Sequence, residues 1–373
     1  MASALLERFP GLCERLPYRS LGCFPTAIER VHGLVSSRVE VFIKREDRAA
    51  ALYGGNKVRK LEHLLGEVPG GPGAATGLPR RLIAYGTYGS NYTLATGLFG
   101  RALGYEVAAV LYPQPLTALV RDRLYEQLGA GVRLWVCPSY LQVPLLRRRA
   151  RRELAGPAPQ PPIAAAPGGS SPLGTLGWVS GGLEIAAQVA AGEAPRFDAV
   201  YAALGSGGMV AGLWLGLGEA AAELVAVRVV PWPIASRTTV RWLAGRTASL
   251  LRSLHQGVPP PLPPRPQLRL DGRWVGGGYA HPTAAGLGAM ARAAAVGVQL
   301  EPTYTGKTLA ALLADADAER LDGKRMLFIH SYNSVDLAPL RAQGAAHPLP
   351  DWLRRRLEAA RLEPAPAAGA LLR

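Results

Sequence analysis

The sequence predicts an α/β protein with mostly parallel sheets that are covered by helices on both faces. Three observations lead to this fold class. The length of 373 residues suggests two domains, or one large body with a subsidiary lobe. With 49% apolar and 18% charged residues, the composition is that of a globular chain. Short apolar runs alternate with stretches of helical spacing, which is the βαβα order of a parallel sheet.

Each element follows from its local pattern. Short apolar or β-branched runs predict seven buried strands: Val39–Lys44, Leu82–Tyr85, Val107–Tyr112, Val132–Val136, Ala199–Leu204, Leu224–Val230 and Met326–His330. Helical spacing predicts nine helices: Lys57–Glu67, Asn91–Leu103, Leu116–Leu128, Tyr140–Leu154, Leu173–Ala191, Val210–Leu217, Arg237–His255, Ala284–Val296 and Leu309–Ala318. Because ligands of such sheets bind at the carboxyl ends of the strands, a site is expected in the loops that follow them.

Four segments are expected to lie outside these elements. Pro157–Ser171 consists mainly of Pro, Ala and Gly without charge, and Val258–Pro266 contains six prolines, so both are predicted to be connectors. Pro69–Pro79 is Gly-rich and predicts a surface loop. The tail Pro364–Arg373 is expected to be frayed.

Cysteine usage and the N-terminus indicate a reducing, cytoplasmic location. Cys13, Cys23 and Cys137 are too few and too scattered for a disulfide framework, and no Cys or His spacing predicts a metal site. The segment Met1–Pro17 carries charges where a signal peptide needs an apolar core. The longest uncharged stretch, Ala199–Gly218, contains six glycines, so no membrane span is expected.

The formal net charge of +15 comes from an excess of arginine, since only five of the 42 basic residues are lysines. Arginine runs such as Arg147–Arg149 and Arg354–Arg356 lack interleaved aromatic residues. They are interpreted as solvated helix faces, and no nucleic-acid partner is expected. In such a chain each lysine is a candidate for chemistry that only an amine can perform, because a guanidinium cannot deprotonate or form an imine.

Lys57 is the strongest of these candidates. It follows Gly54-Gly55-Asn56 and opens a predicted helix. The positive end of the helix and the close approach of glycine backbone both lower the pKa of an amine there and favour its attack on a carbonyl. The alternative is an ordinary surface lysine in the first turn.

Two further loops offer groups that bind anions. Tyr85–Asn91 brings side-chain donors to a helix N-terminus, which suits a carboxylate; the alternative is that Ser90 or Asn91 only caps the helix. Gly205–Met209 exposes consecutive backbone N–H groups after a strand, which suits one phosphate; the alternative is a tight turn that binds nothing. Val210 stands where a dinucleotide fingerprint needs glycine, so a dinucleotide is not expected.

An amine that can form an imine, a cup for one phosphate and a cap for a carboxylate are the requirements of pyridoxal phosphate acting on an amino acid. The sequence resembles the fold type II, tryptophan synthase β-like pyridoxal-phosphate enzymes, and among them the family of D-cysteine desulfhydrase and 1-aminocyclopropane-1-carboxylate deaminase. The resemblance runs from about Phe24 to His330. It is strongest in Ile43–Asp47, Gly54–Glu62, Gly89–Asn91, Gly205–Gly212 and Glu301–Lys307.

The resemblance implies a role for each matching residue. Catalytic roles fall to Lys57, as the Schiff-base lysine, and to Ser90, Tyr279 and Tyr304. Contacts with pyridoxal 5'-phosphate are implied for Lys57, Lys60, Asn91, Gly205, Ser206, Gly207, Gly208, Met209 and Thr305. Substrate contacts are implied for Ser90, Asn91, Tyr92, Tyr279, Tyr304 and Ser331.

The same resemblance implies an architecture of two domains with open, twisted, mostly parallel sheets. The larger domain, which binds the cofactor, is expected to comprise residues 1–60 and 160–373, and the smaller α/β domain residues 61–159. A homodimer is also implied.

Several positions depart from the family pattern. Tyr92, Leu94 and Ala95 stand where the family has His or Gln and then Arg-Gln, Met209 replaces a threonine, and Tyr332 and Asn333 replace two glycines. Thr305 and Ser331 stand where the deaminase branch has Glu and Leu. A neutral hydroxyl at the pyridine nitrogen makes the ring a weaker electron sink, which suffices to expel a good β-leaving group. Opening an unactivated cyclopropane requires a stronger one.

The expected function is therefore α,β-elimination from a small amino acid, foremost a D-amino acid with a β-thiol, which gives a 2-oxo acid, ammonia and sulfide. Four alternatives stay open: a 1-aminocyclopropane-1-carboxylate deaminase, a diverged pyridoxal-phosphate enzyme such as a racemase or β-replacement enzyme, a non-catalytic pyridoxal-phosphate-binding protein, and a basic nucleic-acid binder.

Overall fold

The computed structural model describes residues 3–35, 38–68, 80–155, 162–318 and 323–360. Within these ranges the chain forms two compact units, one of residues up to 68 together with 170–334, the other of residues 80–169 together with 335–360. The predicted domain boundaries stay a prediction, and the two units differ from them in where they place residues 61–68, 162–169 and 335–360. The predicted loop Pro69–Pro79 and the tail Pro364–Arg373 lie outside the described residues.

The larger unit contains a six-stranded sheet in the order β1-β2-β10-β7-β8-β9. All neighbours in this sheet run parallel except β1 and β2, which are antiparallel. The strands are β1 (Ile28–Val31), β2 (Glu40–Lys44), β7 (Phe197–Leu204), β8 (Ala221–Arg228), β9 (Gln267–Asp271) and β10 (Arg325–Ile329).

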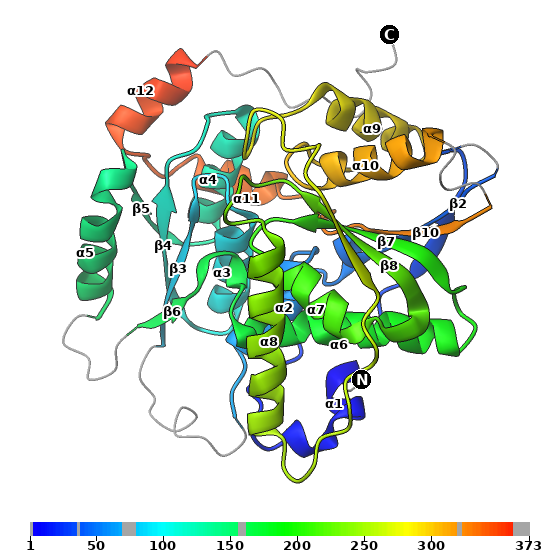
Figure 1. The fold of residues 1–373 in the computed structure, drawn as a ribbon. Coiled ribbons are helices and arrows are strands. Elements are labelled where there is room, and N and C mark those ends of the chain that lie inside the picture. The colour runs from blue at the N-terminus through cyan, green and yellow to red at the C-terminus, as the bar shows by residue number, and fades with distance from the viewer. Residues whose placement is uncertain (1–2, 36–37, 69–79, 156–161, 319–322, 361–373) are drawn as a thin grey trace. The chain divides into compact units, whose positions relative to one another are not determined.

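Helices cover both faces of this sheet (Figure 1). The helices α9 (Ala284–Ala295) and α10 (Thr305–Asp317) lie on one face, and α2 (Lys57–Leu64), α6 (Pro172–Ala190), α7 (Gly208–Gly216) and α8 (Arg237–Leu254) on the other; α1 (Ala4–Arg8) packs on α6. Side chains of β7 alternate between the two cores, with Val200 and Ala202 on the α6–α7 side and Ala199 and Tyr201 on the α9–α10 side. Burial on both faces explains why β7 is a continuous apolar run.

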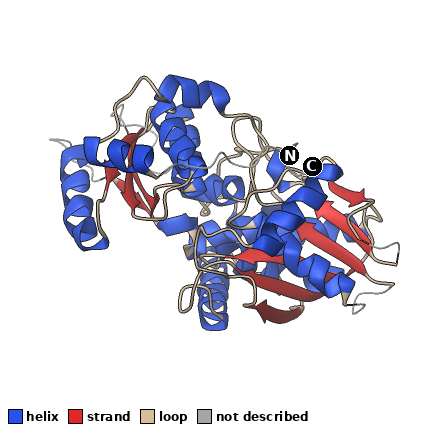
Figure 2. Ribbon diagram, turned by 90° about the horizontal axis from the view of Figure 1, so that it is seen from above, coloured by secondary structure: helices blue, strands red, loops and turns tan. Residues whose placement is uncertain are grey.

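The smaller unit contains a four-stranded parallel sheet in the order β5-β4-β3-β6. Figure 2 shows its strands and helices in red and blue. Its elements are β3 (Arg81–Thr87), α3 (Asn91–Ala102), β4 (Glu106–Tyr112), α4 (Ala118–Gly129), β5 (Arg133–Val136), α5 (Val143–Ala155), β6 (Ile163–Ala165), α11 (Ala338–Gly344) and α12 (Asp351–Ala359). A Cβ on Gly344 would lie 1.7 Å from the Tyr125 carbonyl oxygen, so α11 and α4 are in backbone contact.

Five short 3₁₀ turns complete the described elements: Pro10–Leu12, Glu46–Arg48, Tyr140–Gln142, Pro167–Gly169 and Gly218–Ala220. The stretch Ala199–Gly218 is divided between strand β7 and helix α7. Among the described helices, none is long and apolar enough to cross a membrane.

The predicted fold class and all the predicted strands and helices are confirmed, with ends shifted by a few residues. The prediction of Pro157–Ser171 as a connector is wrong in part, because Ile163–Ala165 forms β6 on the edge of the smaller sheet. This strand was missed because it has only three residues, two of them alanine, which is too short a run to predict a strand. The sequence pattern also missed β1, β9, α1, α11 and α12, while Val258–Pro266 is without helix or strand, as expected.

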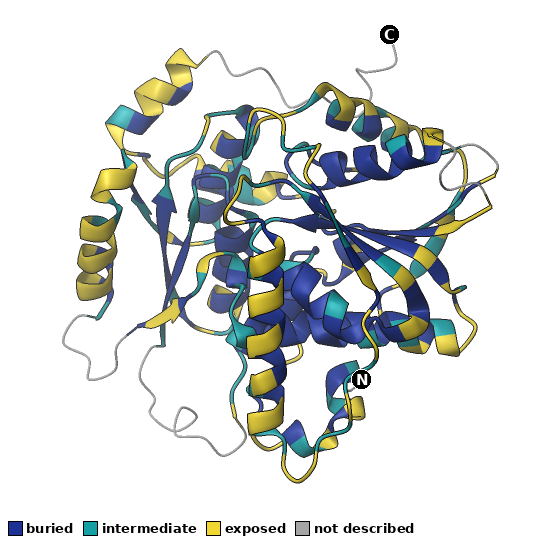
Figure 3. Ribbon diagram, in the orientation of Figure 1, coloured by how far each residue is buried: buried dark blue, intermediate teal, exposed yellow. Residues whose placement is uncertain are grey.

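The strand order brings three loops of the larger unit to one edge of its sheet. Strands β2, β10 and β7 are parallel neighbours, so their carboxyl ends point the same way. The segments that follow them are residues 45–57, 330–334 and 205–208. Figure 3 shows the strands that carry these loops as buried along most of their length.

Candidate active site

Lys57 is the first residue of α2, and the loop before it is pressed tightly against its neighbours. A Cβ on Gly54 would lie 1.8 Å from the Asp47 carbonyl oxygen, and Gly55 has a φ of +87°, so both positions require glycine. The Lys57 side chain is partly buried. This desolvation lowers the pKa of its amine to about 8, and the Glu301 carboxylate opposes the shift. The predicted helix start at Lys57 is confirmed.

The loop between β7 and α7 forms a cradle of hydrogen-bond donors. Gly207 precedes α7 with a φ of +90°, and the Gly208 N–H lies 3.2 Å from Ser170 Oγ. Lys60 Nζ donates to the same Ser170 oxygen at 2.9 Å, and the Ser170 and Ser206 hydroxyls are 2.7 Å apart. Met209, which replaces the family's threonine, is buried in the core with its sulfur 3.7 Å from Asn56 Nδ2.

The composition of this cradle, an amine, two hydroxyls and a backbone N–H at a helix start, fits a phosphate. A Cβ on Gly208 would lie 2.7 Å from Ser170 Oγ and 2.9 Å from Lys60 Nζ, so a side chain there would fill the cradle. Burial, and then repulsion from Lys57, lowers the pKa of Lys60 well below its usual value. A phosphate dianion beside Lys60 would favour its charged form again.

This geometry predicts the effect of a charge in the cradle. Gly207→Asp is expected to weaken binding of pyridoxal phosphate about 10- to 100-fold, because its carboxylate repels the phosphate. Gly207→Asn is the matched control, since it has the same shape and the same backbone strain without the charge. Beyond the neighbouring residues of the chain, a Cβ at this position would meet Thr239 Cγ2 at 3.5 Å, an ordinary van der Waals contact that is the same for both variants. Cofactor titration checks this; equal affinity of the two variants would mean that the loop is only a turn.

The two predicted tyrosines are hydrogen-bonded to each other. The Tyr304 hydroxyl donates to the Tyr279 hydroxyl at 3.0 Å, and the rings meet edge to face. Desolvation, and then the neighbouring Tyr279 and Glu301, raises the pKa of Tyr304 well above its usual value. Tyr304 therefore keeps its proton at neutral pH.

Glu301 organises the start of α10. Its buried carboxylate accepts hydrogen bonds from the backbone N–H groups of Thr303, Tyr304 and Thr305 at 2.7–2.8 Å. The hydroxyl of Thr305, which is also buried, accepts from the Glu301 N–H at 2.9 Å. The neutral group predicted to meet the pyridine nitrogen is thus held in place by Glu301.

The remaining buried lysines have structural partners. Lys307 Nζ donates to the carbonyl oxygens of Val275 at 2.8 Å and Gly278 at 3.3 Å, and so holds the loop that carries Tyr279. Lys44 Nζ donates to Glu184 Oε1 at 2.6 Å within a buried group of charges. The scarcity of lysine therefore did not by itself identify the site: three of the five lysines are buried, Lys57 is partly buried and Lys324 is exposed.

Ser90, Asn91 and Tyr92 belong to the smaller unit, at the carboxyl end of β3. Ser90 Oγ accepts from the Thr93 N–H at 3.3 Å, so the capping role considered for Ser90 is confirmed. Asn91 Oδ1 accepts from Arg123 Nε at 3.0 Å. Tyr92 is fully buried on α3. Contacts of these three residues with cofactor or substrate stay predictions.

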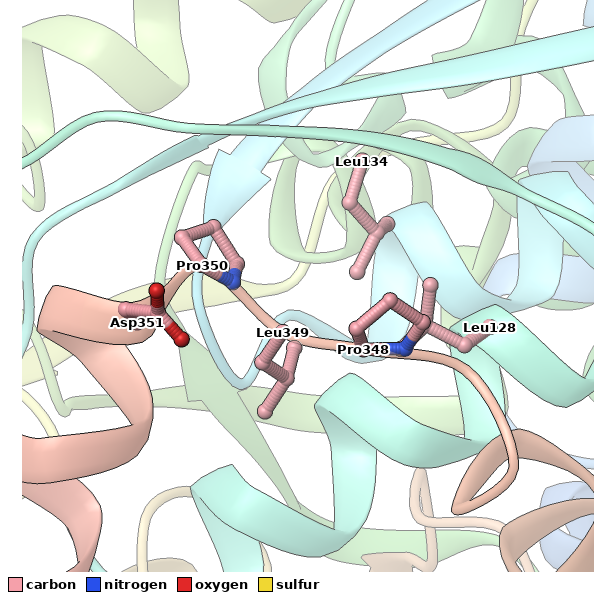
Figure 4. A pocket seen from close by; sticks show the side chains of 6 residues that line it. All are labelled: Leu128, Leu134, Pro348, Leu349, Pro350 and Asp351. Atoms are coloured by element: carbon pink, nitrogen blue, oxygen red, sulfur yellow. The ribbon is translucent and has the colours of Figure 1, made fainter.

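The smaller unit also has an open pocket of about 430 Å³, lined by Leu128, Leu134, Pro348, Leu349, Pro350 and Asp351 (Figure 4). None of the predicted site residues lines it, and its surface is mainly leucine and proline. Pyridoxal phosphate acting on an amino acid needs an amine, donors for a carboxylate and a phosphate site, and this pocket offers none of them among its lining side chains, so it is not the candidate active site.

Two residues of the site were missed from the sequence. Ser170 lies in the stretch interpreted as a connector, where the glycines before it were the available signal. Glu301 opens the motif Glu301–Lys307, in which an acidic residue just before a helix is typical of a carboxylate that caps backbone N–H groups.

Known proteins resemble this chain over most of its length, including the residues of the candidate site. The family model described as "Pyridoxal-phosphate dependent enzyme" matches residues 19–331. The chain is 31% identical over 339 residues to the bifunctional D-cysteine desulfhydrase/1-aminocyclopropane-1-carboxylate deaminase of Arabidopsis thaliana, covering 85% of this chain and 80% of that protein. It is 33% identical over 305 residues to a D-cysteine desulfhydrase of Yersinia pestis, covering 78% and 86%. The crystal structure of an ACC deaminase homologue matches with a TM-score of 0.71 at 26% identity, covering 93% and 99%.

Proposed function

Because the chain belongs to the pyridoxal-phosphate-dependent enzymes, in the family of 1-aminocyclopropane-1-carboxylate deaminase and D-cysteine desulfhydrase, we propose that it is a lyase for α,β-elimination. The proposed substrate is a small D-amino acid with a β-thiol or a similar leaving group. The observation that carries this choice is the buried, uncharged Thr305 hydroxyl, held by Glu301 at the position where the deaminase branch has a glutamate.

The residues of the cradle fit the phosphate end of the cofactor. Lys60, Ser170, Ser206 and the N–H of Gly208 would hold it by hydrogen bonds and charge. When bound, pyridoxal phosphate supplies a carbonyl that joins covalently to amines and a ring that draws electrons from the substrate Cα.

Lys57 is proposed to bond to the cofactor and, once released by the substrate amine, to remove the Cα proton. Both tasks require a neutral amine. The pKa of about 8 leaves about half of the Lys57 amine neutral at pH 8, whereas an amine of pKa 10.5 would be almost entirely charged. Desolvation at the start of α2 therefore prepares this side chain for nucleophile and base.

The bond changes of the proposed reaction balance without an oxidant or a reductant. The Cα proton passes to Lys57, the electrons of the C–H bond form a bond between Cα and Cβ, and the Cβ–S bond breaks so that sulfur leaves with its electron pair. The proton on Lys57 passes to the departing sulfur. In the released enamine a proton then moves from nitrogen to Cβ, and water replaces the nitrogen, which gives ammonia and a 2-oxo acid. Tyr304, which is protonated and bonded to Tyr279, is proposed to shape the substrate side and assist proton transfer.

A substrate panel tests the proposal. Initial rates for D-cysteine, L-cysteine, D-serine, β-chloro-D-alanine and 1-aminocyclopropane-1-carboxylate are measured on one preparation, with 2-oxo acid and sulfide read in parallel. A D-amino acid with a β-leaving group is expected to react at least about tenfold faster than the cyclopropane acid, a difference of ~1.4 kcal/mol in barrier. The physical reason is that a departing sulfur carries charge away, so a shallow electron sink suffices.

Variants at Thr305 provide the matched control. Thr305→Ser keeps the hydroxyl and should keep the substrate preference, whereas Thr305→Glu places a carboxylate that holds a proton on the ring nitrogen and should shift the ratio toward the cyclopropane acid. If the cyclopropane acid is the best substrate of the wild type, the interpretation of Thr305 is wrong. If none of the five substrates reacts while the visible cofactor band is intact, the proposed lyase function is wrong, and the protein is a diverged or a non-catalytic pyridoxal-phosphate-binding protein.

A further inference from the structure

The segment that follows β10 is bonded along its length to the loop that precedes Lys57. The Asn56 N–H donates to the Ser331 carbonyl oxygen at 3.1 Å, and the Gly54 N–H donates to Asn333 Oδ1 at 2.7 Å. Ser334 donates from its N–H at 3.3 Å and from its hydroxyl at 2.9 Å to the Asp47 carbonyl oxygen. The segment 331–334 is thus attached at both ends of the Lys57 loop.

The backbone of the Lys57 loop and that of residues 331–334 lie too close together for a side chain on the loop at Gly55. A Cβ on Gly55 would lie 2.8 Å from the Ser331 carbonyl oxygen and 3.1 Å from the Tyr332 carbonyl oxygen. On its other side, the Gly55 N–H donates to the Glu46 carbonyl oxygen at 2.6 Å. The loop is therefore enclosed between residues 46–47 and residues 331–334.

One of these bonds depends on a side chain that is particular to this sequence. The bond from Asn56 to Ser331 joins backbone atoms and forms with any side chain at residue 331. The acceptor for Gly54 is the amide oxygen of Asn333, a buried side chain at one of the two positions where the family pattern has glycine. Glycine has no side-chain acceptor, so this bond has no counterpart in that pattern.

We propose that Asn333 is a positioning residue, which fixes the Gly54 N–H and thereby the place from which the Lys57 amine reaches the cofactor. Lys57 begins α2 three residues after Gly54, so a rotation of the backbone at Gly54 moves the helix start and the amine with it. The proposal rests on the proposed function only in taking Lys57 as the residue that bonds to the cofactor. It is independent of which amino acid is the substrate.

The test compares the wild-type holoenzyme with Asn333→Ala and Asn333→Asp. Asn333→Ala removes the acceptor, and Asn333→Asp keeps an oxygen in the same place. Hydrogen–deuterium exchange is measured on the peptide that contains Gly54, together with the pH midpoint of the visible cofactor band and the kinetic constants. In Asn333→Ala we expect about tenfold faster exchange at Gly54, a displaced pH midpoint, and a kcat lowered about tenfold with KM changed less. Asn333→Asp should retain the protection of Gly54.

Two controls separate the outcomes. Ser334→Ala removes a neighbouring hydroxyl bond but leaves the residue 334 N–H on the Asp47 oxygen, so it should leave exchange at Gly54 and the pH midpoint unchanged. Asn333→Gly, which restores the residue of the family pattern, replaces Asn333→Ala should that variant fail to fold. Unchanged exchange at Gly54 in Asn333→Ala overturns the proposal. Faster exchange with an unchanged pH midpoint and an unchanged kcat also overturns it, because Asn333 would then have a structural role only. Loss of the visible band in Lys57→Ala checks the role of Lys57 separately.

Discussion

Lys57→Ala is expected to abolish the visible absorbance that we expect of the wild-type holoenzyme, and to lower turnover by at least about three orders of magnitude. The reason is that Lys57 is the amine at the start of α2 whose pKa of about 8 suits it as nucleophile and base. Lys57 is only partly buried and is the first residue of a helix, so the protein should remain folded when this side chain is shortened to alanine. Absorbance spectra, circular dichroism and initial rates measured on the same samples check the three expectations together.

Lys324→Ala is the control for the loss of a lysine as such. Lys324 is exposed and directly precedes β10, so its removal should leave both the visible band and the activity at wild-type levels. A visible spectrum that survives in Lys57→Ala would contradict the assignment. Lys60, which lies in the cradle between β7 and α7, would then be the next residue to examine.

Glu184→Ala is expected to destabilise the protein by about 3–5 kcal/mol, the cost of breaking a buried ion pair. Glu184 accepts from Lys44 Nζ at 2.6 Å and from the two terminal nitrogens of Arg59 at 2.8 and 3.0 Å. Its removal leaves these two buried cations with Glu46 as the remaining carboxylate of the group. Because Arg59 lies on α2, the variant should also release the cofactor more readily. Thermal and urea unfolding measure the loss.

The matched control is Glu193→Ala. Glu193 is an exposed carboxylate just beyond the end of α6, the helix that carries Glu184, so its removal should change the free energy of unfolding by no more than about 0.5 kcal/mol. Equal unfolding midpoints for the two variants would contradict a central role for the buried charges.

The dependence of stability on pH provides a second check on the buried charges around Glu184. Burial opposes ionisation of Glu184, but Arg59 and Lys44 outweigh it and lower the pKa to about 2, against about 4.5 in an unfolded chain. A lowered pKa contributes stability that is present above pH 4.5 and is lost as the pH falls toward 2. In Glu184→Gln this contribution is absent, so stability should fall less steeply between pH 4.5 and 2 than in the wild type.

The family, the fold class and the cofactor could be predicted from the sequence because their signals are local. The segment Gly54–Lys57 shows a glycine loop opening a helix, and Gly205–Gly208 shows a strand ending in a donor-rich turn. Backbone sterics and helix termini give such short segments nearly the same geometry wherever they occur. The alternation of apolar runs with helical spacing likewise identified a parallel sheet without any knowledge of strand order.

What the sequence by itself determined was thus the set of available groups: an amine at Lys57, a donor-rich loop after β7 that suits a phosphate, and a neutral hydroxyl at Thr305. Tertiary structure decided which distant groups complete them. Ser170 meets Lys60 across 110 residues, Glu184 meets Arg59 across 125, and Asn333 meets Gly54 across 279. The contact of Asn333 with Gly54 follows from the strand order β2-β10-β7, which places the ends of three separated strands at one edge. The other two contacts follow from the packing of α6, and of the residues just before it, against α2. Strand order depends on the packing energy of the whole chain, and no local pattern of residues specifies it.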